Sequence, residues 1–295
     1  MAQFGPHTRP MSVQPPKASV RIRLPAEALR SYVTFYYFVT AHEPLTDFLY
    51  PEWGNVRLSL AGEWMVRNDP RDPARPASRP LYGPTDRRGM VETAGGSTAG
   101  FGLTPLGWDR LIGSDASLMA NRVREIHDEL GVDIVALQQA FIVDGADIDA
   151  GVARFDKLLL DLLATRPPNS AVVLAANRVL RQRPRDAAAF AEQVGVAPRT
   201  LHRVCLRAFG FPPKRLLRRQ RFLETLGLIR VAPRSPFGPL IGDAYVDQSH
   251  FNRDFRDFMG MTAGEYARTP RDLMQAAAAA QVAEGITLSF ELPEP

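Results

Sequence analysis

The chain has 295 residues, of which 45% are hydrophobic and 23% charged, so a packed core is expected and wholesale disorder is excluded. This length suggests two domains. The single cysteine, Cys205, excludes an internal disulfide and cysteine-rich zinc sites, and the longest apolar runs are too short to span a bilayer. Because residues 1–17 lack a signal-peptide pattern, these features favour a cytoplasmic protein without membrane contact.

The basic residues are concentrated toward the C-terminal end. Positions 166–271 hold 19 Lys and Arg but 8 Asp and Glu, a net charge of +11. The rest of the chain holds 17 basic and 24 acidic residues, a net charge of −7. A basic block beside an acidic one indicates that one domain meets a polyanion. On charge alone, a solvated basic surface is an equally good interpretation.

Strand-like patterns dominate the N-terminal half. Residues 1–18 are rich in proline and predict a flexible tail, after which apolar residues alternate with arginines over 20–24. Residues 56–66 hold two strand-like runs on either side of Ala61-Gly62, which indicates a hairpin. This half is therefore expected to be mainly β.

Apolar residues recur at helical spacing over 147–165. Two interpretations of this stripe stay open: the helix packs on its own sheet, or it forms a dimer. The Arg-Pro-Pro-Asn sequence at 166–169 ends the helix and marks a domain boundary that few contacts need to cross. The predicted organisation is a tail at 1–18, a sensor or dimerisation domain at 19–166, a DNA-binding domain at 169–270 and a poorly ordered tail at 271–295.

A first helix-turn-helix pattern follows this boundary. Asp186 can cap a helix over 187–193, Gly195 permits a tight turn, and a second helix can run from Pro198 to about residue 208. The apolar residues of the second helix share one face. Its opposite face carries three candidates for base contacts in a major groove, Arg199, His202 and Arg203.

A second pattern repeats this plan. A weak helix over 239–243 and a turn over 244–246 precede Asp247, which can cap a helix to about residue 259. Three phenylalanines share one face of this helix. The candidates for base contacts on its other face are Ser249, Asn252, Arg253 and Arg256.

The segment between the two patterns predicts one basic helix over 213–230. A rigid helix here would fix the distance between the two units, and successive major grooves on one face of DNA lie about 34 Å apart. Among its basic residues, Arg218 is the candidate for a phosphate contact.

The two units resemble the DNA-binding domain of the AraC/XylS family of bacterial regulators. The resemblance rests on FAEQVGVAPRTLHRVCLRAFGFPPKRLLRRQRF and on AYVDQSHFNRDFRDFMGMTAGEY. It implies that Arg199, His202 and Arg203 contact one groove of double-stranded promoter DNA. It also implies that Ser249, Asn252 and Arg253 contact the next. The family usually has an aromatic residue at the position of Cys205.

The N-terminal half resembles a sensor domain found in some members of that family. The matching stretches are FYYFVTA, LYPEWGNVRLSLAGEW, YGPTDRR and GFGLTPLGW. The resemblance implies a cupin-like β domain followed by helices, with a small-molecule effector and a homodimer as further expectations. The predicted fold class of the whole chain is therefore α+β.

No catalytic signature is present in the sequence. The five histidines are scattered, and neither a Gly-x-Ser-x-Gly motif nor a phosphate loop occurs, so we predict no catalytic residue, cofactor or metal site. The sequence thus predicts a transcription regulator rather than an enzyme. Two alternatives stay open: a DNA-binding protein without a ligand, and a metal-dependent cupin enzyme fused to a DNA-binding module. The second would use His42, Glu43 and Glu52 as metal ligands, although polar surface residues beside strands are the simpler interpretation.

Overall fold

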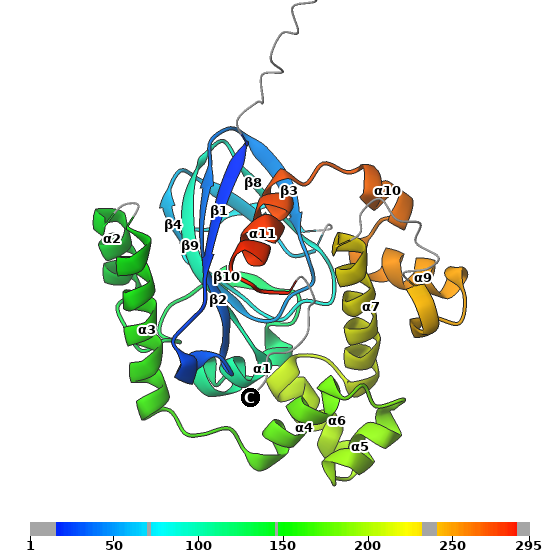
Figure 1. The fold of residues 1–295 in the computed structure, drawn as a ribbon. Coiled ribbons are helices and arrows are strands. Elements are labelled where there is room, and N and C mark those ends of the chain that lie inside the picture. Colours follow the sequence, from blue (N-terminus) through cyan, green and yellow to red (C-terminus); the bar gives the residue numbers. More distant parts are fainter. Residues whose placement is uncertain (1–15, 70–71, 145–146, 232–240, 288–295) are drawn as a thin grey trace, which may run out of the picture.

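Two antiparallel sheets form the β domain of the computed structural model, which describes residues 16–69, 72–144, 147–231 and 241–287 (Figure 1). The six-stranded sheet contains, in spatial order, β1 (Ala18–Arg23), β2 (Val33–Ala41), β9 (Gly96–Leu103), β4 (Asn55–Ala61), β7 (Pro80–Tyr82) and β10 (Val123–Glu125). The four-stranded sheet contains β3 (Leu45–Leu49), β8 (Gly89–Thr93), β5 (Trp64–Arg67) and β6 (Arg75–Pro76). The alternation predicted over 20–24 corresponds to the edge strand β1, in which Ile22 is buried and Arg21 exposed.

The hairpin predicted around Ala61-Gly62 is wrong. Although β4 and β5 are adjacent in the chain, β4 pairs with β7 and β9, whereas β5 pairs with β6 and β8. The turn instead carries the chain from one sheet to the other. Gly62 has a φ of +69°, and a Cβ there would lie 2.0 Å from the carbonyl oxygen of Gly95, so this crossing requires glycine.

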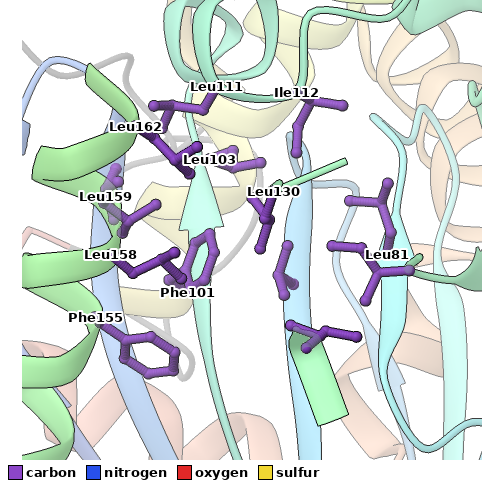
Figure 2. Close-up of a cluster of buried hydrophobic side chains, with 14 of the residues drawn as sticks. Leu81, Phe101, Leu103, Leu111, Ile112, Leu130, Phe155, Leu158, Leu159 and Leu162 are labelled. Carbon is purple, nitrogen blue, oxygen red and sulfur yellow. The ribbon is translucent and has the colours of Figure 1, made fainter. Parts of the chain in front are cut away.

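Two helices cover the six-stranded sheet, α2 (Ile134–Asp144) and α3 (Ile148–Thr165) (Figure 1). Asp147 caps α3, because its Oδ1 accepts a hydrogen bond from the backbone N of Ala150 at 3.0 Å. Figure 2 shows the apolar stripe of α3 packed toward β9, with Phe155, Leu158, Leu159 and Leu162 in the same cluster as Phe101. The structure therefore agrees with the first interpretation, in which the stripe packs on the sheet of its own domain.

The remaining elements are short connectors and the helices of the second half. The connectors are the 3-10 turns η1 (Glu27–Leu29) and η3 (Ala116–Leu118), the short α1 (Pro105–Gly107) and the π-helical η2 (Trp108–Ile112). The second half contains α4 (Ala171–Arg181), α5 (Ala187–Val194), α6 (Pro198–Phe209), α7 (Pro213–Val231), the 3-10 turn η4 (Gly242–Ala244), α9 (Gln248–Met259), α10 (Ala263–Arg268) and α11 (Asp272–Ala283). The predicted α+β class is confirmed, while the cupin-like relationship stays a prediction.

Two hydrophobic cores are shared between the β domain and the C-terminal helices. One core joins Trp53 and Leu106 to α4, α5 and α6. The other joins Phe48 and Tyr50 to α7, α9 and α10. The expectation that few contacts cross residues 166–169 is therefore wrong. Two prolines determine where a helix ends, but they do not determine whether the segments on either side pack together.

The C-terminal segment forms the helix α11 where the sequence predicted a tail. Alanine has the highest helix propensity, and Leu273 gives the helix an apolar side chain that is 5% exposed against the β domain. Figure 1 shows α11 lying beside β1 and β3. Most of the tail predicted at 1–18, and residues 288–295 of the other tail, lie outside the described residues.

Candidate nucleic-acid interface

The first helix-turn-helix unit consists of α5 and α6. Asp186 caps α5, since its Oδ1 accepts a hydrogen bond from the backbone N of Ala189 at 2.8 Å. Gly195 ends α5 with a φ of +77°, in the left-handed region that favours glycine, and Pro198 is the first residue of α6. The two predicted helices are therefore present, and each ends one residue beyond its predicted end.

The two faces of α6 differ as the sequence predicted. Leu201, Cys205 and Ala208 are at most 1% exposed and pack in the core shared with Trp53. Three side chains on the opposite face are exposed, those of Arg199, His202 and Arg203. They make no ion pair with the described part of the chain. Their donors are therefore accessible to another molecule.

The second unit is built around α9. Asp247 caps this helix, because its Oδ1 accepts a hydrogen bond from the backbone N of His250 at 2.6 Å. Gly260 ends it with a φ of +63°. The helix predicted at 239–243 begins outside the described residues, and the structure has the 3-10 turn η4 over Gly242–Ala244 in front of Asp247.

The face of α9 that packs inward is aromatic. Phe251, Phe255 and Phe258 are fully buried, and the ring of Phe258 stacks on that of Phe222 from α7 at 4.8 Å between centroids. The outward face holds the predicted contact residues, of which Asn252 is half-buried and three are exposed, Ser249, Arg253 and Arg256. The surface position of all four agrees with a base-contacting role, which stays a prediction.

The guanidinium of Arg218 is engaged within the protein. It donates to Asp254 Oδ1 at 2.6 Å and to Asp257 Oδ2 at 2.9 Å, both on α9. Arg221 donates to the other oxygen of Asp254 at 3.0 Å, and the Asp254 side chain is 2% exposed. These ion pairs hold α9 against α7. Arg218 thus has a positioning role that the sequence analysis missed, beside the predicted phosphate contact.

Two other basic residues of α7 face the β domain. Arg219 donates from Nε to the carbonyl oxygen of Thr85 at 2.8 Å, and its guanidinium lies 3.9 Å from the ring centroid of Trp53. Burial lowers the pKa of Arg219. Arg215 pairs with Asp86 at 2.5 Å. These contacts could not be predicted from the sequence, because a run of arginines does not reveal which side chains face solvent.

Cys205 lies inside the first unit. Its side chain is fully buried, and burial raises the pKa of its thiol to about 12. A thiol in such surroundings is a small core group rather than a nucleophile.

A cavity of about 150 Å³ lies in the β domain. Most of its walls are apolar, with contributions from Val20, Phe35, Val39, Leu49, Trp64 and Val91. Two arginines and one glutamate also line it, Arg57, Arg230 and Glu52. Arg57 donates to Glu52 Oε1 at 3.1 Å and to the hydroxyl oxygen of Tyr37 at 2.9 Å, and burial raises the pKa of Glu52.

Among the residues that the structure describes, no three His, Cys, Asp or Glu side chains form a group that could hold a metal ion. His42 instead hydrogen-bonds to Ser19, with 3.1 Å between Nε2 and Oγ, and Glu52 is paired with Arg57. The interpretation of His42, Glu43 and Glu52 as metal ligands thus has no such group to support it. Within the same residues, no helix is both long and apolar enough to cross a membrane.

Comparison with known proteins identifies the helical region. A family model described as a helix-turn-helix domain matches residues 190–269, which confirms the AraC-type domain predicted there. The solved structure of ToxT from Vibrio cholerae is 10% identical, covers 85% of this chain and 97% of its own, and has a TM-score of 0.45. The AraC-like transcriptional activator CuxR is 14% identical, covers 69% of this chain and 85% of its own, and has a TM-score of 0.27. No curated protein matches the chain.

Proposed function

We propose that this chain, a DNA-binding transcription regulator with an AraC-type helix-turn-helix domain at residues 190–269, contacts two successive major grooves with α6 and α9. The main evidence for this proposal is the structure of these two helices. Helix α6 begins with Pro198 and α9 is capped by Asp247, and each helix buries an apolar face and exposes polar side chains on the other. Helix α7 lies between the two units in Figure 1 and is suited to fix their separation.

The exposed side chains suit specific contacts with base edges. The guanidinium groups of Arg199, Arg203 and Arg253 can each donate two hydrogen bonds to guanine O6 and N7. The amide of Asn252 suits adenine in the same way. His202, Ser249 and Arg256 lie on the same faces and can contact neighbouring bases or phosphates. The side chain of Arg218 is 36% exposed, so it can approach a phosphate while it holds Asp254.

We place the effector site in the cavity of the β domain. The cavity is concave and apolar, with a few polar groups, as small-molecule sites usually are. The protein is then a ligand-responsive regulator that acts on promoter DNA in the cytoplasm and catalyses no reaction. A homodimer would have to use a surface other than the stripe of α3, which the β domain buries.

DNA binding by the full chain tests the proposal directly. A duplex selected from a random library should bind with an affinity that falls steeply with salt, because Lys and Arg contacts release counterions. Fluorescence anisotropy at several salt concentrations gives the slope. If no library duplex binds at low salt, the proposed function is wrong.

A further inference from the structure

We propose that α11 is the closing wall of the β-domain cavity, and that an apolar monoanion bound in this cavity locks α11 onto the β domain. This inference rests on the effector role proposed above for the cavity, and it adds the class of ligand and the element that responds.

Helix α11 supplies one side of the cavity. Leu273, Met274, Ala277 and Gln281 line it together with side chains of both sheets. The helix begins soon after α10, so it is directly continuous with the DNA-binding domain. A ligand in the cavity would contact the β domain and α11 at once, and would be lost whenever α11 moved away.

Polar contacts that hold α11 in place come from two strands of the β domain and from α7. Asp47 on β3 accepts a hydrogen bond from the backbone N of Met274 at 3.1 Å, which satisfies one free amide in the first turn of α11. Arg23 on β1 pairs with Glu284 just beyond the other end of the helix. Arg230 on α7 donates to Gln281 Oε1 at 3.1 Å. These polar contacts act together with the packing of Leu273 on the β domain, and a ligand in the cavity would add further apolar contacts to α11.

The cavity wall favours a negatively charged ligand. Its ionisable groups include two arginines and one glutamate, so the wall stays positive whether or not Glu52 is protonated. Trp64 lines the same cavity and is 5% exposed, and within the described residues its indole Nε1 donor has no hydrogen-bond partner. A buried donor without an acceptor is costly, which a ligand carboxylate could relieve. A cavity of about 150 Å³ accommodates a benzene-sized apolar group.

Three probes that share one apolar body test the charge preference: 3-phenylpropanoate, 3-phenylpropan-1-ol and 3-phenylpropylamine. We expect calorimetry on the full chain to show that the carboxylate binds most tightly. At ten times its dissociation constant, hydrogen exchange of the α11 amides should slow about 10-fold, because opening of α11 would require release of the ligand. Equal binding of all three probes, or binding of the carboxylate without added protection of α11, would overturn the proposal.

Two matched substitutions on α11 locate the ligand. Ala277→Trp puts an indole into the cavity and should abolish both binding and the added protection, whereas Ala279→Trp, at an exposed position of the same helix, should change neither. Trp64→Phe keeps an aromatic wall but removes the donor, so it should weaken carboxylate binding about 10-fold and alcohol binding less. Unaltered binding in both Ala277→Trp and Trp64→Phe would place the ligand elsewhere.

The salt-dependent DNA titration separates this inference from the proposed function. If the chain binds its selected duplex but the carboxylate does not slow hydrogen exchange in α11, the inference is wrong and the proposed DNA-binding function is unaffected. If the duplex does not bind at all, the proposed function fails first.

Discussion

The two helix-turn-helix units are held to the rest of the molecule by different forces. The first unit packs through an apolar core that includes Cys205 and Trp53. The second unit has an aromatic core, and it is also tied to α7 by the ion pairs of Asp254 with Arg218 and Arg221. Apolar packing tolerates substitutions that conserve volume, whereas a buried ion pair that loses one partner leaves charge without compensation. We therefore expect the second unit to be the more easily damaged by a change at one polar residue.

Loss of Asp254 is the strongest test of this difference. Asp254→Ala leaves two guanidinium groups, each about a third exposed, without their shared carboxylate, so we expect it to lower the stability of the second unit by about 2 kcal/mol. Hydrogen exchange should become faster in α9 while α6 is unaffected. Asp257→Ala is the matched control, because Asp257 pairs with the same Arg218 but is 41% exposed and should cost less than about 1 kcal/mol. Equal effects of the two substitutions would refute the comparison.

Substitution of the exposed arginines tests whether both units contact bases. Arg203→Ala and Arg253→Ala should each weaken binding by about 1–3 kcal/mol and relax specificity at one base position. The corresponding lysine variants retain the charge but lose the two-pronged donor, so they should retain phosphate affinity and still lose specificity. Sequence selection from a random library measures this. If neither alanine variant changes the selected motif, the proposed groove contacts are wrong.

The stability of the folded protein should depend on pH through Asp47, which accepts a hydrogen bond from α11. Burial raises the pKa of Asp47 to about 6, although the amides of Met274 and Phe48 oppose the rise, and nearby Asp272 adds to it. The folded state thus binds the Asp47 proton more tightly than the unfolded state does. The resulting contribution to the free energy of unfolding is complete below about pH 4 and is lost as pH rises through 6. Asp47→Asn should accordingly raise stability by about 1–3 kcal/mol at pH 7.5 and leave it nearly unchanged at pH 4.

Urea unfolding of the wild type and this variant at the two pH values measures the effect. A variant that is less stable than the wild type at pH 7.5 would show that the hydrogen bonds of the carboxylate outweigh its burial.

Labelling of Cys205 probes the first unit without altering it. Because the thiol is buried and its pKa is raised to about 12, a maleimide should react slowly with the native protein and rapidly in denaturant. The native rate should be the same in Asp254→Ala, because that substitution affects the other unit. Faster native labelling in Asp254→Ala would mean that the two units open together.

The sequence predicted best those features that depend on neighbouring residues. The caps at Asp186 and Asp247 and the buried faces of α6 and α9 follow from helical spacing and the hydrogen-bonding capacity of an aspartate, so they were correctly identified. The turn at Gly62 was misassigned, because its conformation suits a hairpin and a crossing between sheets equally well.

The contacts between distant segments were missed for a related reason. Arg219 on Trp53, and Leu273 against the β domain, lie at ordinary positions in their own helices. Nothing within a few residues of either side chain distinguishes it from a solvated one. The alanine run was accordingly interpreted as a tail, although it forms the helix α11 when packed on the β domain.

The path of the chain through the molecule has one further consequence. The DNA-binding helices leave the β domain after α3 and return to it in α11, so both of their ends are attached to the same body. After release of α11, residues 166–169 and the two shared cores would still join the DNA-binding helices to the β domain, so the return of α11 would be an intramolecular step at a high effective concentration. Such a step does not depend on the protein concentration in the cell. The same closure acts together with the two shared cores to restrict movement of both units relative to the β domain.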